Sequence, residues 1–257
     1  MSVSTYLATR ASNAVLSTTE RNSVGTSIST LQTRLDSWFV DKLTTHFKFG
    51  SFTRDTILPR SMDTQSDIDY MVVFKEGGYQ PQTYLDRLKK FVEARYQTSE
   101  LYQSSPTIVL ELNHIKFELV PALDATFGTG YRIPRAAGGW QDTNPNDFNA
   151  KLTAKNVAEG HCLKPAIRLA KFWNANDGYV FNSYLLEKWI VDQQYWSCGN
   201  VRDYLFAIFE NLALPTDAQW RKDKVQRAKD IVAQVKKYER DKMPVNAELE
   251  VKKLIPA

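Results

Sequence analysis

Apolar residues recur at steps of three and four along two stretches in the first hundred residues of the chain. The first stretch runs from Asn22 to Phe47 and predicts one long amphipathic helix, which ends at Gly50 because glycine permits a turn there. The second begins at Pro81, a residue that suits the first turn of a helix, and continues to Tyr96. Each helix would cover a core with its apolar face.

Between and after these two helices, the pattern changes to short runs that are typical of β-strands. Residues 70–74 are wholly apolar, as expected of a strand that is covered on both faces. Two further β-rich runs, 107–112 and 115–120, are separated by the turn residues Asn113 and His114, which predicts a hairpin.

The second half of the chain is mainly helical in pattern. Residues 128–148 are rich in Gly, Pro, Asn and Asp, which predicts an ordered loop anchored by Trp140. The helices predicted after it cover about 153–173, 183–194, 201–211 and 217–240.

This order of elements predicts an α/β (α+β) protein in which a small mixed β-sheet core carries a long N-terminal helix and is followed by a C-terminal helical lobe. We expect residues 1–155 to form the core and residues 156–242 to form the lobe, which would close a nucleotide cleft. The remaining residues, 243–257, contain two prolines and several lysines, and we expect a flexible tail.

Composition excludes several classes of protein. Of 257 residues, 43% are hydrophobic and 24% are charged, as in an ordinary globular protein. The chain has no apolar run long enough to cross a membrane and no signal-peptide pattern at its start. Its two cysteines suit a reducing cytosol, so we expect a cytoplasmic protein. With two cysteines, three histidines and no CxxC motif, a zinc module is not expected.

Asp67 and Asp69 are the most informative residues for chemistry. They lie two positions apart at the start of an apolar strand, so their carboxylates point to the same side and repel each other. Mg²⁺ relieves such a conflict, because it binds carboxylates together with substrate phosphates and water. A Gly50-Ser51 turn precedes them and offers backbone N–H groups and a hydroxyl to phosphate oxygens. The combination indicates metal-dependent nucleotide chemistry.

Several runs of residues, spread over roughly positions 20 to 240, resemble the polymerase-β-type nucleotidyltransferase superfamily. Within it, the chain looks most similar to the bacterial cGAS/DncV-like nucleotidyltransferases (CD-NTases), which are relatives of oligoadenylate synthetase. The runs that carry the resemblance are Gly50-Ser51, Asp67-Ile68-Asp69, Phe117-Glu118-Leu119-Val120-Pro121, the loop from Ile133-Pro134 to Asn144-Pro145, Lys171-Phe172-Trp173-Asn174 and Asn182-Ser183-Tyr184-Leu185-Leu186-Glu187.

The resemblance implies a two-metal site for Mg²⁺, with Mn²⁺ as an alternative ion. Asp67 and Asp69 would bind both ions, and a third carboxylate must reach the ion on the side of the attacking hydroxyl. We select Glu118, because it faces away from the apolar side of its strand and matches the third acidic position of the family. Glu111 and Asp124 are its rivals.

The resemblance also implies a set of nucleotide contacts. Ser51 would contact the triphosphate while Gly50 lets the backbone approach closely, and Thr56 would either touch a phosphate or stabilise the loop. Further along the chain, Lys171 would pair with the β- and γ-phosphates. Ser183 would hydrogen-bond to these phosphates and Tyr184 would stack on the base.

Each of the last three contacts has a plain structural reading as well. A lysine in the position of Lys171 is commonly exposed at the surface, and a serine in the position of Ser183 commonly caps a helix. A tyrosine in the position of Tyr184 commonly belongs to the core.

The predicted activity is therefore that of an Mg²⁺-dependent nucleotidyltransferase. A 2′- or 3′-hydroxyl of one NTP would attack the α-phosphate of another and release pyrophosphate, and repetition would give a cyclic di- or trinucleotide second messenger for bacterial anti-phage signalling. The alternatives are a linear oligonucleotide product, transfer to an RNA, protein or small-molecule hydroxyl, and an inactive nucleotide-binding module.

The net charge bears on the expected partners. It is only +4, which suits a pocket for triphosphates, and the sequence shows no continuous basic track for long DNA. We expect NTP substrates, a monomeric chain and no membrane partner, and a regulatory partner protein is an open alternative.

Overall fold

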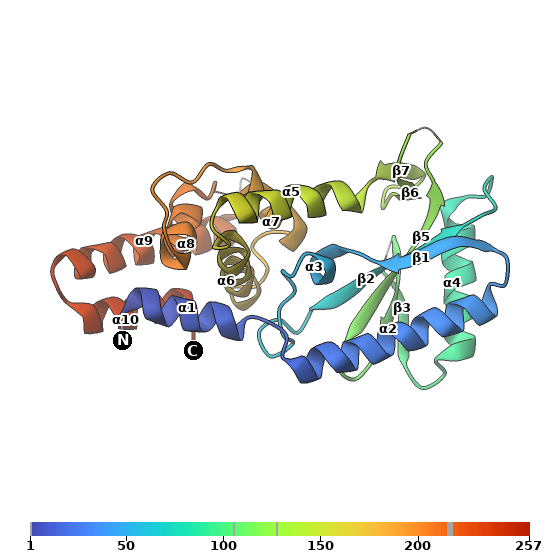
Figure 1. Cartoon of the computed structure of the whole chain (residues 1–257), viewed down its shortest axis with the longest axis horizontal. Coiled ribbons are helices and arrows are strands. Elements are labelled where there is room, and N and C mark those ends of the chain that lie inside the picture. The colour runs from blue at the N-terminus through green and yellow to red at the C-terminus, as the bar shows by residue number, and fades with distance from the viewer. Residues whose placement is uncertain (1, 105, 127, 215–217) are drawn as a thin grey trace. The chain divides into compact units, whose positions relative to one another are not determined.

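The computed structural model describes residues 2–104, 106–126, 128–214 and 218–257, which form two compact units (Figure 1). The sheet unit consists of Leu16–Arg60 and Gln65–Ala150, and the helical unit consists of Met1–Val15, Ser61–Thr64 and Lys151–Ala257. The division into a sheet-bearing part and a helical part resembles the predicted one. It differs in that the first helix and the short segment 61–64 belong to the helical unit, and the boundary falls after residue 150.

The predicted mixed sheet is confirmed, and it has seven strands in the described part of the sheet unit. The strand order is β1-β2-β5-β4-β3, and β6 pairs with both β5 and β7. β2 and β5 run parallel, whereas every other pair is antiparallel. The strands are β1 Leu43–Lys48, β2 Asp67–Phe74, β3 Glu100–Ser104, β4 Thr107–Glu111, β5 Lys116–Asp124, β6 Tyr131–Pro134 and β7 Trp140–Thr143.

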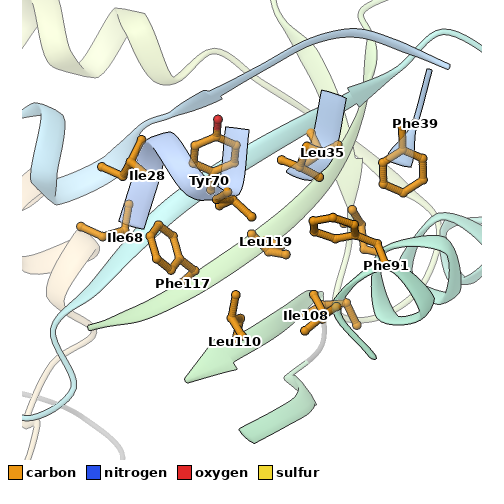
Figure 2. Close-up of a cluster of buried hydrophobic side chains, with 14 of the residues drawn as sticks. Ile28, Leu35, Phe39, Ile68, Tyr70, Phe91, Ile108, Leu110, Phe117 and Leu119 are labelled. Atoms are coloured by element: carbon orange, nitrogen blue, oxygen red, sulfur yellow. The ribbon is translucent and has the colours of Figure 1, made fainter. Parts of the chain in front are cut away.

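Two helices cover one face of this sheet, α2 (Thr18–Trp38) and α4 (Pro81–Arg95). Alternate residues of β2, from Ile68 to Phe74, point toward them because side chains alternate across a strand. Figure 2 shows this core, in which side chains of both helices meet those of β2, β4 and β5. Because the even-numbered positions of β2 face the core, its odd-numbered positions, including Asp67 and Asp69, face the opposite side.

The long helix predicted from Asn22 to Phe47 is wrong after Trp38. Helix α2 ends at Trp38, Asp41 follows with a positive φ of 56°, and β1 begins at Leu43. Leu43 and Phe47 are four residues apart, a spacing that fits one face of a strand as well as one face of a helix. Pairing of β1 with β2 therefore decides the structure, and it places the residues before Gly50 alongside Asp69.

The segment 128–148, predicted as a loop, contains the hairpin β6–β7 among its described residues. Trp140 does act as its anchor: it packs against the core of the sheet unit, and its ring lies edge-on to that of Tyr84 with centroids 5.5 Å apart. Strand β3 was not predicted, because its residues are mostly exposed and give no apolar pattern.

The helical unit contains α1 (Val3–Asn13) and a series of helices from the second half of the chain. The predicted helix 153–173 is in fact two helices, α5 (Pro145–Ala158), which crosses the boundary between the units, and α6 (Leu163–Asn176). Gly160 and His161 separate them with positive φ angles of 58° and 61°. The others are α7 Ser183–Asp192, α8 Val201–Asn211, α9 Gln219–Arg240 and α10 Pro244–Leu254.

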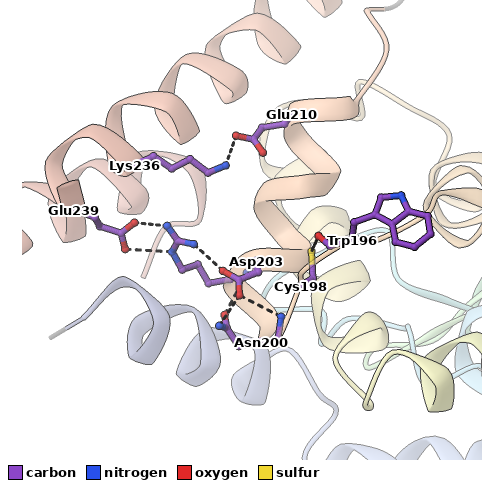
Figure 3. Close-up of polar contacts among 9 residues, drawn as sticks. Trp196, Cys198, Asn200, Asp203, Glu210, Lys236 and Glu239 are labelled. Atoms are coloured by element: carbon purple, nitrogen blue, oxygen red, sulfur yellow. Dashed lines mark hydrogen bonds and ion pairs between the residues drawn. The ribbon is translucent and has the colours of Figure 1, made fainter.

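Ion pairs join α8 to α9, as Figure 3 shows. Arg202 of α8 donates hydrogen bonds to both carboxylate oxygens of Glu239 on α9 and to Asp203 in its own helix, and Lys236 of α9 pairs with Glu210 of α8. Each of these charges has a partner of opposite sign.

The expected flexible tail at 243–257 is instead ordered as α10. Its apolar residues Ala247, Val251 and Leu254 are buried, and α10 packs against α9 and α1. The Tyr6 hydroxyl of α1 donates a hydrogen bond to the carbonyl of Ile255 at 2.6 Å. The prolines thus begin and follow a helix rather than prevent one. Within the described residues, no helix is both long and apolar enough to cross a bilayer.

Candidate active site

The Gly50-Ser51 turn lies against the start of β2. β1 runs antiparallel to β2 with Lys48 opposite Tyr70, so the residues that follow β1 reach the end of β2 that carries the aspartates. The backbone N–H of Phe49 donates a hydrogen bond to the carbonyl of Asp69 at 2.9 Å. A single helical turn, α3 (Gly50–Thr53), starts at this point.

Gly50 is required there for two independent reasons. Its φ is +71°, a left-handed conformation that favours glycine. A Cβ atom at this position would lie 1.7 Å from the Oδ2 atom of Asp69, which is far inside van der Waals contact. The backbone of the turn therefore approaches the Asp69 carboxylate as closely as the chain allows.

Four charged side chains form a compact group on the face of the sheet opposite to α2 and α4. Asp67 and Asp69 are two positions apart on β2, and Lys116 and Glu118 are two positions apart on β5. In the parallel register, Asp67 pairs with Lys116 and Asp69 pairs with Glu118, so the four residues occupy adjacent positions. We call this group the charged quartet.

The register also separates Glu118 from its rivals. Glu111 lies on β4 and forms an ion pair with Arg60 at 2.9 Å. Asp124 is exposed at the far end of β5, where it pairs with Tyr131 of β6. Of the three carboxylates considered, Glu118 is the one placed directly beside Asp69.

The burial and the crowding of the carboxylates together affect the pKa of Asp67. Burial, together with the negative charges of Asp69 and Glu118, raises the pKa of Asp67 from a usual value of 3.8 to about 8. The positive charge of Lys116 opposes this shift without cancelling it. The group therefore lacks positive charge, and a divalent cation would supply it.

The residues present fit Mg²⁺ in the chemistry of their donors. Asp67, Asp69 and Glu118 supply carboxylate oxygens, which this ion prefers, from adjacent positions of one sheet face. As they stand, no three carboxylate, histidine or cysteine side chains of the described chain are arranged around one point as metal ligands. Asp67 and Glu118 instead flank the Lys116 ammonium.

Ser51 and Thr56 take different positions in the turn. Ser51 is partly exposed, and its carbonyl accepts backbone hydrogen bonds from Thr56 at 3.0 Å and Ile57 at 3.2 Å. Thr56 is fully buried, and its hydroxyl lies 3.5 Å from the same carbonyl. This geometry favours the loop-stabilising role of Thr56 over contact with a phosphate.

The other predicted nucleotide contacts belong to the helical unit. Lys171 of α6 is buried, not exposed at the surface, and its ammonium donates a hydrogen bond to the buried Glu187 of α7 at 2.7 Å. Ser183 is the first residue of α7, but the cap is Asn182, whose side chain accepts from the N–H of Leu185. Tyr184 is 47% exposed and is not a core residue.

Lys116 is the residue of this site whose importance the sequence did not reveal. It lies on the same face of β5 as Glu118, because the two residues are two positions apart on the strand. Its proximity to Asp67 arises from the parallel pairing of β2 with β5, two strands that are far apart in the sequence, so no local pattern indicates it.

Comparison with known proteins identifies relatives of this chain by sequence and by fold. A protein family described as the Second Messenger Oligonucleotide or Dinucleotide Synthetase domain matches residues 1–156. A protein of Bacillus cereus (strain VD146), named Probable cyclic nucleotide synthase, is 28% identical over 206 residues. That match covers 64% of this chain and only 60% of the relative's length.

Solved structures share the fold over nearly the whole chain. CdnC of E. coli MS115-1 with ATP has a TM-score of 0.75 at 15% identity, covering 99% of this chain and 98% of its own. CdnG of Bradyrhizobium diazoefficiens, a CD-NTase in complex with GTP, has a TM-score of 0.71 at 13% identity, covering 96% and 97%. A complex of CdnC with HORMA-deltaN has a TM-score of 0.73 at 16% identity, covering 99% and 97%.

Proposed function

This chain belongs to the Second Messenger Oligonucleotide or Dinucleotide Synthetase family, and from that premise we propose that it joins nucleoside triphosphates into a cyclic oligonucleotide and releases pyrophosphate. One observation carries the proposal. The Gly50 backbone is packed on Asp69, and Asp67 and Glu118 occupy the adjacent positions of the same sheet face. A phosphate-binding turn beside three carboxylates is what nucleotidyl transfer requires.

In this proposal, one set of residues binds the nucleotide and another binds the metal ions. The Gly50-Ser51 turn presents backbone N–H groups and the Ser51 hydroxyl to the triphosphate. Asp67, Asp69 and Glu118 would hold divalent ions, Mg²⁺ or Mn²⁺, next to it. When bound, these ions supply the positive charge that favours an ionised attacking hydroxyl and a departing pyrophosphate.

Positioning contributes as much as charge does. Asp69 and Glu118 are fixed on paired strands, so the relative placement of the two carboxylates is set by backbone hydrogen bonds and does not depend on flexible loops. A preorganised arrangement of this kind avoids reorganisation during the reaction. Rigid strands therefore suit a site in which attacking and leaving oxygens must be aligned.

The remaining nucleotide contacts in the proposal rest on the resemblance to the CD-NTases. Tyr184 has the exposure that stacking on a base requires, and Ser183 lies at the N-terminus of α7, where the helix favours anions. Lys171 would have to share its ammonium between Glu187 and a phosphate. We assign Thr56 to the stability of the turn.

The relatives support the choice of substrate and product. CdnC and CdnG were solved with ATP and GTP, and the Bacillus cereus relative is named as a cyclic nucleotide synthase. We therefore assign NTPs as substrates and a cyclic second messenger as product, with anti-phage signalling as the biological setting. The complex of CdnC with HORMA-deltaN supports the inclusion of a regulatory partner protein in the proposal.

The decisive experiment incubates the purified chain with each labelled NTP, alone and in pairs, together with Mg²⁺ or Mn²⁺. A small product that resists phosphatase is the expected result, because a cyclic oligonucleotide has no terminal phosphate. A phosphatase-sensitive oligomer would indicate a linear product instead. If the wild-type chain consumes no NTP under any of these conditions, the proposed activity is refuted.

A further inference from the structure

Lys116 lies inside the carboxylate group rather than beside it. Its ammonium nitrogen is 3.7 Å from Oδ2 of Asp67 and 3.6 Å from Oε1 of Glu118, and 3.5 Å from the side-chain oxygen of Gln65. The side chain is only 8% exposed. All three of these neighbours are oxygen atoms, so the ammonium occupies a site that is built of ligands for a cation.

The distances show that Lys116 is shared between the two carboxylates. A charge-assisted hydrogen bond to a single carboxylate is about 2.7–2.9 Å long, and Lys171 makes such a bond to Glu187 at 2.7 Å. Lys116 is nearly equidistant from Asp67 and Glu118 and is too far from either for a short bond. An ammonium in this position acts as a point charge between two ligands.

A metal ion and this ammonium would compete for the same place. An Mg²⁺ ion must come within about 2.0–2.1 Å of its carboxylate oxygens, so an ion that bridges Asp67 and Glu118 would have to displace the Lys116 ammonium. Like charges so close together repel strongly in a partly buried site. This competition agrees with the absence, among described residues, of a group already arranged around a metal position.

We propose that Lys116 is a resident cation of the charged quartet, which weakens binding of free divalent ions until a nucleotide arrives. The inference rests on the proposed function, because it takes the quartet to be the metal site. An incoming triphosphate brings its own metal and offers the ammonium a new anionic partner. Lys116 is then a positioning residue that makes metal binding depend on the nucleotide.

The charge of Lys116, rather than its packing, should control metal affinity. We expect Lys116→Met, which keeps the length of the side chain and removes its charge, to bind Mn²⁺ about tenfold more tightly than the wild type without nucleotide. Lys116→Arg keeps the charge and should bind Mn²⁺ weakly, as the wild type does. The measurement is a titration of the protein with Mn²⁺. The electron paramagnetic resonance signal of the unbound ion monitors the titration.

Two further variants serve as controls for misfolding and for a general effect of net charge. Lys116→Gln retains hydrogen-bonding capacity without charge, and it replaces Lys116→Met if that variant does not fold. Lys75→Met removes a positive charge from an exposed site just beyond the other end of β2, and it should leave Mn²⁺ affinity unchanged. A change as large in Lys75→Met would mean that only the net charge of the protein matters, which overturns the inference.

A non-hydrolysable ATP analogue tests the link to nucleotide. It should tighten Mn²⁺ binding by the wild type more than by Lys116→Met, because Lys116→Met has already lost the competing charge. Equal affinity of wild type and Lys116→Met, with Asp69→Asn abolishing Mn²⁺ binding, would overturn this inference and leave the metal site intact. If Asp69→Asn leaves Mn²⁺ binding unchanged, the metal assignment within the proposed function fails as well.

Discussion

The two units of this protein differ in how their buried charges are balanced. In the helical unit, Lys171 and Glu187 lie 2.7 Å apart with side chains only 6% and 1% exposed, so each buried charge contacts a charge of opposite sign. In the sheet unit, Asp67 and Glu118 flank the ammonium of Lys116 at 3.7 and 3.6 Å, both beyond hydrogen-bond distance, and Asp69 lies beside Glu118 in the strand register. The charges of the helical pair balance each other, whereas the carboxylates of the sheet unit outnumber their positive charge.

The difference indicates which charges serve the fold and which serve a ligand. A matched buried pair satisfies itself, and removal of either partner leaves an uncompensated charge in the interior. In the quartet, burial and the neighbouring negative charges raise the pKa of Asp67, and a cation would offset that excess of negative charge. We therefore expect substitutions in the quartet to reduce activity and substitutions in the helical pair to reduce stability.

The largest expected effect comes from Asp69→Asn, which tests the sheet side of the comparison. The variant removes a charged ligand that is backed by the Gly50 turn. Because metal ions contribute several kcal/mol of charge stabilisation, we expect NTP turnover to fall by at least about 10³-fold. Product formation from labelled NTPs measures the rate, and circular dichroism shows whether the fold is intact.

Asp124→Asn is the matched control for this prediction. Asp124 is an exposed carboxylate at the far end of β5, so the same chemical change there should leave turnover close to that of the wild type. Near-wild-type activity in Asp69→Asn would refute the metal assignment.

The next largest effect tests the helical side. Lys171→Met should lower the free energy of unfolding by about 3–5 kcal/mol, because it leaves Glu187 buried without its partner. Lys224→Met breaks an ion pair of the same 2.7 Å length with Asp177, but that lysine is 36% exposed. We expect a loss of no more than about 1 kcal/mol there. Denaturation in urea measures both values, and equal losses would remove the distinction between buried and exposed pairs.

A double variant separates the structural role of Lys171 from its proposed contact with phosphate. Lys171→Met combined with Glu187→Leu replaces the buried pair by apolar side chains, which is often nearly neutral for stability. If Lys171 also contacts the triphosphate, KM for NTP should rise roughly tenfold in this stable variant. A wild-type KM would mean that Lys171 acts only within the fold.

Gly50→Ala should reduce stability less than Lys171→Met does. Because Gly50 contacts Asp69, it should also reduce activity. Its Cβ would lie 1.7 Å from the Asp69 carboxylate, and a φ of +71° strains any other residue, so we expect a loss of about 1–3 kcal/mol. Turnover should fall as well, because the carboxylate must move.

Gly25→Ala offers the opposite outcome. Gly25 lies within helix α2, and a Cβ there meets no atom within 4 Å, so this variant should gain about 0.5–1 kcal/mol. Thermal unfolding compares the two. Unchanged stability and turnover in Gly50→Ala would contradict the close approach of the turn to Asp69.

The sequence predicted those parts of the molecule that depend on local pattern. The hairpin β4–β5, the helix α4 and the shared face of Asp67 and Asp69 all follow from the alternation or helical spacing of neighbouring residues. The choice of Glu118 rested on alternation along β5, which sets the direction of its side chain, and on the resemblance to the nucleotidyltransferases.

The features that the sequence did not predict depend on contacts between distant segments. Strand β1 is a strand because it pairs with β2, although its apolar spacing fits a helix equally well. Helix α10 is ordered because α1 and α9 cover it. The pair of Lys171 and Glu187 joins two helices, and the approach of Lys116 to Asp67 joins two parallel strands. None of these partners is specified by its neighbours in the sequence.

The smallest expected effect is on the pH dependence of the metal-free protein, and it follows from the raised pKa of Asp67. With a pKa of about 8 in the folded chain and a usual value of 3.8, the folded state holds a proton on Asp67 that the unfolded state releases above pH 4. This stabilisation is complete below about pH 4 and is lost as pH rises through 8. Its slope is at most about 1.4 kcal/mol per pH unit.

Thermal unfolding in EDTA between pH 6 and 8.5 measures this contribution as a difference between variants. The melting temperature of the wild type should fall more steeply with pH than that of Asp67→Asn, which has no carboxyl proton to lose, whereas Asp124→Asn should follow the wild type. Because a metal ion competes with the same proton, stabilisation by Mg²⁺ should increase over this range. If Asp67→Asn has the same pH profile as the wild type, the carboxylates of the sheet unit are not short of positive charge, and the contrast with the helical unit fails.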